Sequence, residues 1–263
     1  VIDFTKLADK LWGKKNVSTA AVFLQKSRPD SEPVLHLIAN RTFSNANKLF
    51  LEFDYYDFHF MSKNDAIFKP YTWKAHLLGG GRITSLIERL STLPTLKEFL
   101  KEKERKEGWC VGIGYIIGDK SNKADFITGK ETIPVEALTE NGIDEKQIHE
   151  CLIQRFERPR KTKKKIYEGP HILIRVITGN QGIPIAYSEK YLTFPFGIIG
   201  IHAPQDDKSE LSALYDYLRE NNSLLRSYIL ATSGRAMIGK ATSINKDDIM
   251  RIPYSHNKND IIF

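Results

Sequence analysis

The chain lacks most of the features that mark a small secreted protein or a membrane protein. Of its 263 residues only two are cysteines, Cys110 and Cys151, which is too few for a disulfide framework or a four-cysteine zinc site. We therefore expect a reducing, cytoplasmic location. No apolar run approaches the roughly 18 residues that cross a bilayer, so we expect no membrane partner. The seven histidines are scattered without metal-ligand spacing.

Recognisable catalytic motifs are also absent. The segment Gly234–Ala241 resembles a phosphate-binding loop, but Ala241 stands where that loop needs serine or threonine to hold magnesium. The glycines at 112, 114 and 118 are one residue off the dinucleotide-binding pattern. Gly79–Gly81 could expose N–H groups to a phosphate or simply form a flexible joint. We find no nucleophile elbow and no paired catalytic carboxylates, so this chain by itself is predicted to be non-catalytic, without metal or cofactor.

Positive charge is the feature that the sequence does have, and it is concentrated in one place. The formal net charge is +7, and the segment from residue 155 to 165 carries six of these charges. Its basic residues are Arg155, Arg158, Arg160, Lys161, Lys163, Lys164 and Lys165, with Glu157 as the one acid. Such a patch on an otherwise balanced protein predicts a polyanionic partner, nucleic acid before a membrane surface. The alternative is a solvated basic loop.

The first half of the chain changes from strand patterns to helix patterns. The apolar runs 19–25 and 34–39 flank a turn with two prolines, which predicts antiparallel neighbours. A further strand is expected over 55–61. Ile83, Leu86, Ile87 and Leu90 have helical spacing. After Pro94, Thr95 and Glu98 predict a capped second helix.

The second half returns to strands and then ends in helices. Strands are expected at 109–117, 131–134, 171–177, 183–188 and 197–201, and helices at 208–220 and 223–231, followed by a turn at 246–251. The pattern predicts an α+β fold, with an irregular, mostly antiparallel sheet unit and a C-terminal helical segment, preceded by a small strand-rich section. We expect boundaries near 1–70, 71–107 (a helical linker) and 108–263.

Several short phrases, in order, resemble one family. Lys15–Lys26 is similar to the segment after the catalytic motifs of N-6 adenine DNA methyltransferases, and Trp73–Gly79 resembles the joint that follows. Pro170–Arg175 is similar to the central strand of the specificity part, and Leu224–Gly234 leading into Ile244–Pro253 resembles its closing passage. The chain thus resembles the C-terminal region of a methylase of a bacterial restriction-modification system, with the end of the methyltransferase domain at 1–70 and the target-recognition domain at 108–263.

This resemblance implies sequence-specific recognition of double-stranded DNA. The Asn/Asp-Pro-Pro-Tyr/Phe motif for the target adenine and the glycine motif for S-adenosylmethionine do not occur here. Since the chain begins with Val1 rather than methionine, we expect both motifs upstream, in a parent enzyme that uses S-adenosylmethionine. The partners implied are duplex DNA, the upstream methyltransferase domain and other restriction-modification subunits. The basic segment would hold phosphates, and the candidates for reading bases are Arg175, Asn180, Gln181 and Lys190.

Three other functions stay open at this point. The chain could be a non-catalytic assembly or specificity subunit that docks on a partner through the helices at 83–107 and 208–231. It could bind RNA through the same basic run, although only Phe156 offers an aromatic ring inside it. The interpretation as an independent hydrolase or nucleotide-binding enzyme depends only on the 234–241 loop, which departs from the phosphate-binding pattern at Ala241.

Overall fold

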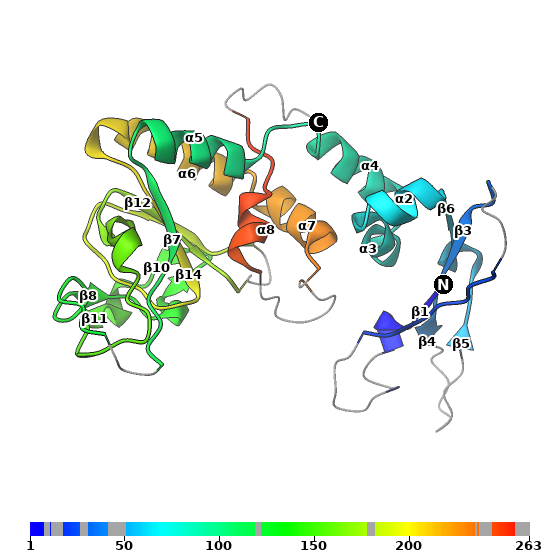
Figure 1. Cartoon of the computed structure of the whole chain (residues 1–263), viewed down its shortest axis with the longest axis horizontal. Helices are drawn as coiled ribbons and strands as arrows, with labels where there is room; N and C mark the ends of the chain where they lie inside the picture. The colour runs from blue at the N-terminus through cyan, green and yellow to red at the C-terminus, as the bar shows by residue number, and fades with distance from the viewer. Residues whose placement is uncertain are drawn as a thin grey trace. The chain divides into compact units, whose positions relative to one another are not determined.

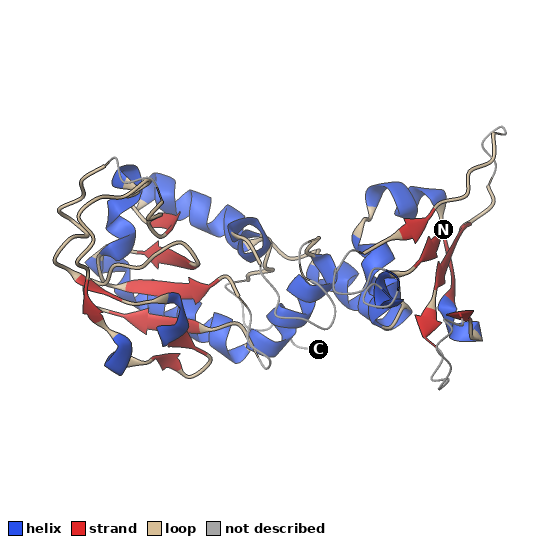
Figure 2. Cartoon of the chain, turned by 90° about the horizontal axis from the view of Figure 1, so that it is seen from below, coloured by secondary structure: helices blue, strands red, loops and turns tan. Residues whose placement is uncertain are grey.

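The computed structural model describes residues 1–7, 11, 18–26, 31–41, 51–118, 122–177, 182–234, 236 and 244–255. The chain divides into two compact units, Val1–Leu90 (unit 1) and Ser91–Phe263 (unit 2). Each unit combines helices with small, mostly antiparallel sheets (Figures 1 and 2), so the predicted α+β class is confirmed. Among the described residues, no helix is both long and apolar enough to cross a bilayer.

Unit 1 consists of a four-stranded sheet with three helices after it. The strand order is β2-β1-β3-β6, and β4 pairs separately with β5. The strands are β1 (Ile2–Asp3), β2 (Ala20–Ala21), β3 (Val34–Ile38), β4 (Asn40–Arg41), β5 (Leu51–Glu52) and β6 (Phe58–Met61). The helices are α2 (Lys63–Phe68), α3 (Tyr71–Leu78) and α4 (Gly81–Leu90), with 3-10 turns η1 (Thr5–Leu7) and η2 (Tyr55–Asp57).

The predicted pairing of the runs 19–25 and 34–39 is wrong, because β1 lies between them. Ile2 pairs with Ala21 of β2 in antiparallel register and with Leu37 of β3 in parallel register. A two-residue strand is too short to give a periodic signal, so the sequence offers no sign of it. The strand expected over 55–61 begins only at Phe58, because Asp54 caps the η2 turn before it.

The helices expected over 71–107 do not form a separate linker. Helix α4 belongs to unit 1, where it buries Ile87 and Leu90. Helix α5 (Leu96–Lys106) belongs to unit 2 and buries Leu96, Phe99 and Leu100 in its core. Each helix has an apolar face that must be covered, and each finds its cover in a different unit.

Unit 2 is built around a four-stranded antiparallel sheet in the order β13-β12-β14-β7. These strands are β7 (Cys110–Ile113), β12 (His171–Arg175), β13 (Ile185–Ser188) and β14 (Ile198–His202). Two short antiparallel pairs lie between β7 and β12 in the chain: β8 (Glu131–Thr132) pairs with β11 (His149–Glu150), and between them β9 (Leu138–Thr139) forms a hairpin with β10 (Gly142–Ile143). The helices after the sheet are α6 (Lys208–Glu220), α7 (Asn222–Thr232) and α8 (Lys246–Met250), and the 3-10 turns are η3 (Val135–Ala137), η4 (Glu145–Gln147), η5 (Lys161–Tyr167) and η6 (Gln205–Asp207).

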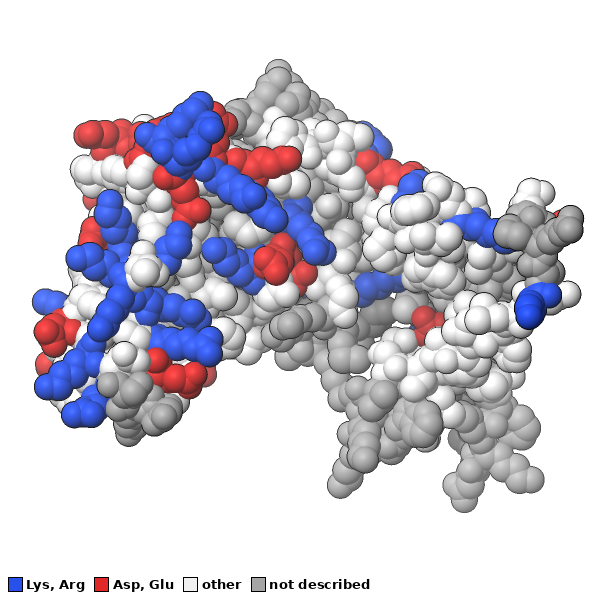
Figure 3. Space-filling view, viewed as in Figure 1, with Lys and Arg blue, Asp and Glu red and all other residues white. Residues whose placement is uncertain are grey.

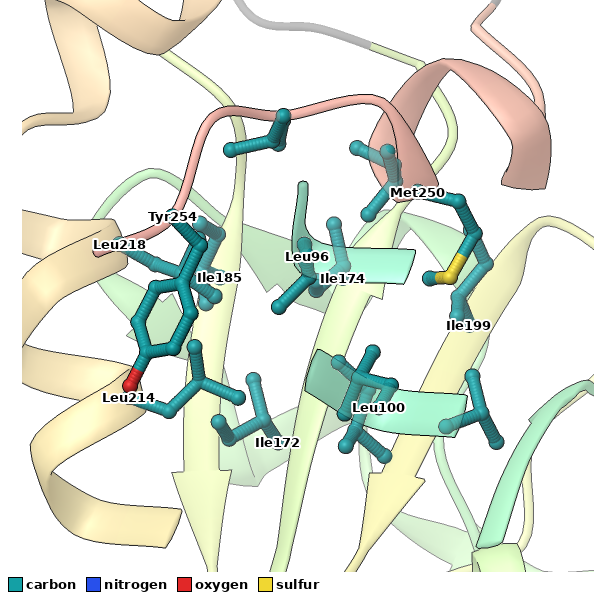
Figure 4. Close-up of a cluster of buried hydrophobic side chains, with 14 of the residues drawn as sticks. Leu96, Leu100, Ile172, Ile174, Ile185, Ile199, Leu214, Leu218, Met250 and Tyr254 are labelled. Carbon is teal, nitrogen blue, oxygen red and sulfur yellow. The ribbon is translucent and has the colours of Figure 1, made fainter. Parts of the chain in front are cut away.

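Both faces of this sheet are buried, each in its own apolar cluster. Ile172 and Ile174 of β12 face the helices α5, α6, α7 and α8, as Figure 4 shows for part of the cluster. Leu173, between them, faces the opposite cluster with Phe194 and Tyr167. Because successive side chains of a strand point to opposite faces, an uninterrupted apolar run such as 172–174 fits a strand covered on both sides.

Candidate nucleic-acid interface

The basic segment is bonded to the sheet of unit 2 beside strand β7. Strand β7 is the last strand in the sheet order, and its outer edge is met by side chains: Val111 N–H donates to Glu104 Oε1 at 3.1 Å, and Lys246 Nζ donates to Val111 O at 3.4 Å. Just beyond β7, Ile116 N–H donates to the carbonyl of Arg158 at 2.9 Å in an antiparallel bridge. The η5 turn then packs over β7 and β14, where Ile166 lies close to Gly112 and Gly200.

The apolar end of the segment anchors it to the sheet. Arg160 has a left-handed backbone (φ 63°), and the η5 turn that follows ends with Ile166 and Tyr167 fully buried. A side chain at Gly112 would bring a Cβ to 3.2 Å from Ile166, so the glycine in β7 lets η5 pack closely. The lysines of η5 are thereby held on the surface of a fixed scaffold rather than on a free loop.

The seven basic residues differ in how far they are available to a partner. Arg155, Arg158, Lys161, Lys164 and Lys165 are exposed, whereas Arg160 and Lys163 are half-buried. Figure 3 shows Lys and Arg side chains gathered on the viewed face of unit 2. We call the exposed set (155, 158, 161, 164 and 165) the basic edge.

The two half-buried basic residues have internal partners. Lys163 Nζ forms an ion pair with Glu104 at 2.7 Å, which ties η5 to α5. Burial opposes the charge of Lys163, but the bond to Glu104 outweighs it and raises the pKa of the lysine. Arg160 Nε donates to Gly114 O at 3.5 Å. These two residues position the segment, while the basic edge stays open to solvent.

Lys246 is a basic residue near this edge that the sequence analysis missed. It begins α8, and its neighbours include Lys163, Glu104 and Cys110. Burial lowers the pKa of Lys246, and the same effect raises the pKa of the Cys110 thiol. Lys246 and Val111 are 135 residues apart in the sequence, so no local sequence pattern could predict their contact.

The two base-reading candidates that the structure describes, Arg175 and Lys190, do not lie in one site. Arg175 and Lys190 lie toward opposite ends of the β12–β13 pair, in which His171 faces Ser188. Arg175 is half-buried and donates through Nη1 to Leu138 O at 3.3 Å, while its Nε is buried without a hydrogen bond. Lys190 is exposed, 3.4 Å from Glu145. Asn180 and Gln181 lie outside the described residues.

The glycines at 114 and 118 serve close packing. A Cβ at Gly114 would lie 2.2 Å from Phe194 O, and one at Gly118 would lie 1.9 Å from Glu157 Oε2. Glycine at these two positions lets chain segments approach each other. Gly234 follows α7, and most of the loop up to Ala241 lies outside the described residues.

Three carboxylates in unit 2 are held in a network of ion pairs and hydrogen bonds. Within the described residues, Glu107, Asp207 and Glu210 form the one cluster with metal-ligand proximity. Lys103 is paired with both glutamates, and Trp109 Nε1 donates to Asp207 at 2.8 Å. The cluster is thus accounted for as an ion-pair network.

Unit 1 contains a histidine cluster that the scattered sequence positions did not predict. His36 on β3 pairs with His59 on β6, and its Nδ1 lies 3.1 Å from the Nδ1 of His76 on α3. The rings of His59 and His76 are stacked, with centroids 4.3 Å apart. His59 and His76 also line a cavity of about 530 Å³ together with Lys6, Tyr55 and other residues of unit 1.

Burial, assisted by repulsion from its neighbours, lowers the pKa of His76 to about 4. Burial likewise lowers the pKa of His59. His59 and His76 are therefore neutral imidazoles at neutral pH. His36 is fully buried, with its Nε2 3.6 Å from Asp3.

Comparison with known proteins adds no relative to this picture. No family model matches the chain, and no curated protein sequence matches it.

Proposed function

We propose that unit 2 binds double-stranded DNA through the basic edge, as the target-recognition module of an N-6 adenine DNA methyltransferase of a restriction-modification system. The observation that carries this proposal is the set of exposed cations, Arg155, Arg158, Lys161, Lys164 and Lys165, on a segment that pairs with Ile116 and is anchored by the buried end of η5. Phosphate contacts of this kind set the register of a protein on the duplex, so that other side chains can read base edges.

The environment of Phe156 favours a duplex over single-stranded RNA. Proteins that bind single strands stack the bases on exposed aromatic rings beside the basic residues. Phe156 is the one aromatic residue between 155 and 165, and it is fully buried against Tyr115. Within residues 155–165 no aromatic ring is therefore open for stacking, and the exposed Phe196 outside the segment is a single ring, whereas single-strand binding stacks successive bases.

Methyl transfer is assigned to the rest of the parent enzyme. S-adenosylmethionine and the target adenine would bind to an upstream methyltransferase domain, and we place the whole enzyme in the bacterial cytoplasm with its DNA. Unit 1 has a large exposed apolar surface that such a domain, or another subunit, would cover. Its most exposed members are Phe23, Leu24, Tyr55, Tyr56, Phe60, Ile67 and Phe68.

The test is the salt dependence of duplex binding. We would measure fluorescence anisotropy of a random-sequence DNA duplex and of single-stranded RNA over a salt series. In the variant Lys161/Lys164/Lys165→Ala, the slope of log K against log salt should fall by about 2.7, since each phosphate contact contributes about 0.9. RNA should bind more weakly than the duplex.

Two controls separate phosphate contacts from general charge. Lys163→Ala removes one positive charge from the same segment. Because Lys163 is paired with Glu104, the slope of log K against log salt should change little. Lys97/Lys130/Lys146→Ala removes three exposed lysines outside the segment and should also leave the slope unchanged. Absence of duplex binding at low salt, or an equal slope in the Lys161/Lys164/Lys165 variant, would refute the proposal.

A further inference from the structure

Phe196 is an exposed aromatic side chain on a rigid part of unit 2. Its side chain is 57% exposed, although Phe194 and Ile198 on either side are fully buried. The backbone is held at three points: Phe196 N–H donates to Tyr115 O at 2.6 Å, Ile198 N–H to Pro195 O at 3.3 Å, and Val176 N–H to Gly197 O at 2.9 Å. Phe196 therefore projects from a fixed turn, and its exposure is not the result of a loose chain.

Glycine is required next to Phe196 to make this turn. Gly197 has a φ of +119°, and a Cβ there would lie 2.9 Å from Val135. The conformation of this turn is thus fixed by its close packing against Val135. More than half of the Phe196 side chain is left uncovered by this unit, so it can make further apolar contact with a partner.

Other exposed apolar residues lie beside Phe196. The β12–β14 register ends at Arg175 and Ile198, and beyond it Val176 N–H donates to Gly197 O. Ile177, which is 36% exposed, follows Val176, and Phe196 precedes Gly197. Ile117, 41% exposed, follows two residues after Tyr115, which accepts from Phe196 N–H. We call these three exposed side chains on neighbouring segments the apolar tip (117, 177 and 196).

The apolar tip adjoins the basic segment. Arg160 Nε donates to Gly114 O, and a Cβ at Gly114 would lie 2.4 Å from Pro195 O, the residue before Phe196. Arg158 pairs with Ile116, the residue before Ile117. A polyanion bound along the basic edge would therefore reach the apolar tip at its end.

We propose that Phe196, flanked by Ile117 and Ile177, makes apolar contact with the bases of the bound duplex. This inference rests on the proposed function. Phosphates attract cations and accept hydrogen bonds, and a phenylalanine side chain offers neither, whereas bases offer two apolar targets. A wedge residue can enter a base-pair step, and an apolar side chain can contact the methyl group of thymine.

The main test compares Phe196→Ala with the wild-type full chain on DNA duplexes. We expect an affinity loss of about tenfold without a change in salt slope, because the contact involves no phosphate. Phe196→Leu, which keeps an apolar side chain, should recover part of the loss. Leu152→Ala is the matched control, since Leu152 is 76% exposed in the same unit but outside the apolar tip. Thermal melting should be the same for all variants.

Two DNA probes distinguish the kinds of contact. A duplex with 2-aminopurine at successive positions brightens when a base step is opened, and Phe196→Ala should abolish this signal if Phe196 is a wedge. A duplex with uracil in place of thymine should bind more weakly, with no further loss in Phe196→Ala, if the contact is to the methyl group.

Failure of this inference can be told from failure of the proposed function. If the wild-type chain binds duplexes with a steep salt slope while Phe196→Ala binds equally well, base contact by Phe196 is refuted and DNA binding stands. If Phe196→Ala instead alters self-association in sedimentation at unchanged duplex affinity, the apolar tip is a protein contact, which also refutes the inference. If the wild-type chain does not bind duplexes, the proposed function itself fails.

Discussion

At some positions of this chain, the residue type is explained by how closely another chain segment approaches. Gly114 has no side chain because the backbone of the Phe194–Pro195 turn crosses directly over it, with Phe194 O 2.2 Å from the position a Cβ would take. The same crossing brings the apolar tip next to Arg160. A spacing that resembles a cofactor motif in the sequence is therefore explained by the packing of two chain segments.

We expect Gly114→Ala to lower the free energy of unfolding of unit 2 by roughly 2 kcal/mol or more, because the colliding atoms are backbone and cannot rotate away. Gly234→Ala is the control, since no atom lies within 4 Å of a Cβ there. Its effect should stay within about 0.5 kcal/mol. Urea unfolding followed by circular dichroism measures both, and equal midpoints for the two variants would contradict the packing argument.

The histidine cluster of unit 1 should make that unit sensitive to acid. In the unfolded chain His76 titrates near 6.5, whereas in the folded unit its pKa is lowered to about 4. Between these values the unfolded state binds more protons, so the free energy of unfolding falls as pH drops from 6.5 toward 4 and is fully recovered above 6.5. Asp3, Asp57 and Lys6 are the charged groups that lie near these imidazoles.

Trp73, 5.0 Å from the His36 ring, provides a fluorescence signal for this transition. Melting temperatures measured by that fluorescence should fall with pH in the wild type and fall less in His76→Gln. His149→Gln serves as a control because His149 is exposed in unit 2. A pH profile that is the same in His76→Gln and the wild type would show that the cluster is not the acid-sensitive element.

At the scale of elements, α5 and η5 act together to present the basic edge. Glu104 of α5 accepts a hydrogen bond from Val111 N–H and also pairs with Lys163 of η5. One carboxylate thus covers the exposed edge of β7 and holds the basic segment in place. Covering an edge strand in this way also prevents pairing with another chain.

Glu104→Gln should therefore release Lys163 for DNA while keeping an oxygen that can accept from Val111. We expect tighter duplex binding and a salt slope steeper by about 0.9, one additional phosphate contact. The double variant Glu104→Gln/Lys163→Ala should return the slope to the wild-type value. An unchanged slope in the single variant would mean that Lys163 cannot reach a phosphate.

At the scale of the whole molecule, the two units have independent cores. Both buried clusters of unit 2 consist of residues between Leu96 and Tyr254, and neither draws on unit 1. Unit 1 carries the larger share of the exposed apolar residues, among them Leu24 at 91% and Tyr55 at 83%. The two large buried apolar clusters and the proposed DNA contact thus lie in unit 2, and most of the exposed apolar side chains lie in unit 1.

Residues 91–263 alone should consequently fold with a cooperative thermal transition and bind duplex DNA as the full chain does. The full chain should bind more of the dye ANS per molecule than residues 91–263, because the exposed apolar side chains of unit 1 are missing from the shorter chain. Calorimetry and dye titration measure the two properties. A shorter chain that melts without cooperativity would contradict the independence of the two cores.

The sequence by itself determined the features that depend on near neighbours. The capped helix at Thr95, with Glu98 Oε2 accepting from Thr95 N–H at 2.7 Å, was predicted from the spacing of two residues. The helix predicted over 208–220 coincides with α6. The basic segment was equally visible, since charge is read directly from composition. Helix periodicity and charge are local properties, so a single sequence displays them.

Only the tertiary structure decided which of those charges are available and what lies beside them. Lys163 is paired with Glu104, which lies 59 residues earlier in the chain, whereas Lys164 is exposed. His36 contacts His76, which lies 40 residues later. The insertion of β1 between β2 and β3, and the position of Phe196 beside the basic segment, are equally non-local. Burial and pairing depend on contacts between residues far apart in sequence, and such contacts exist only once the chain has folded.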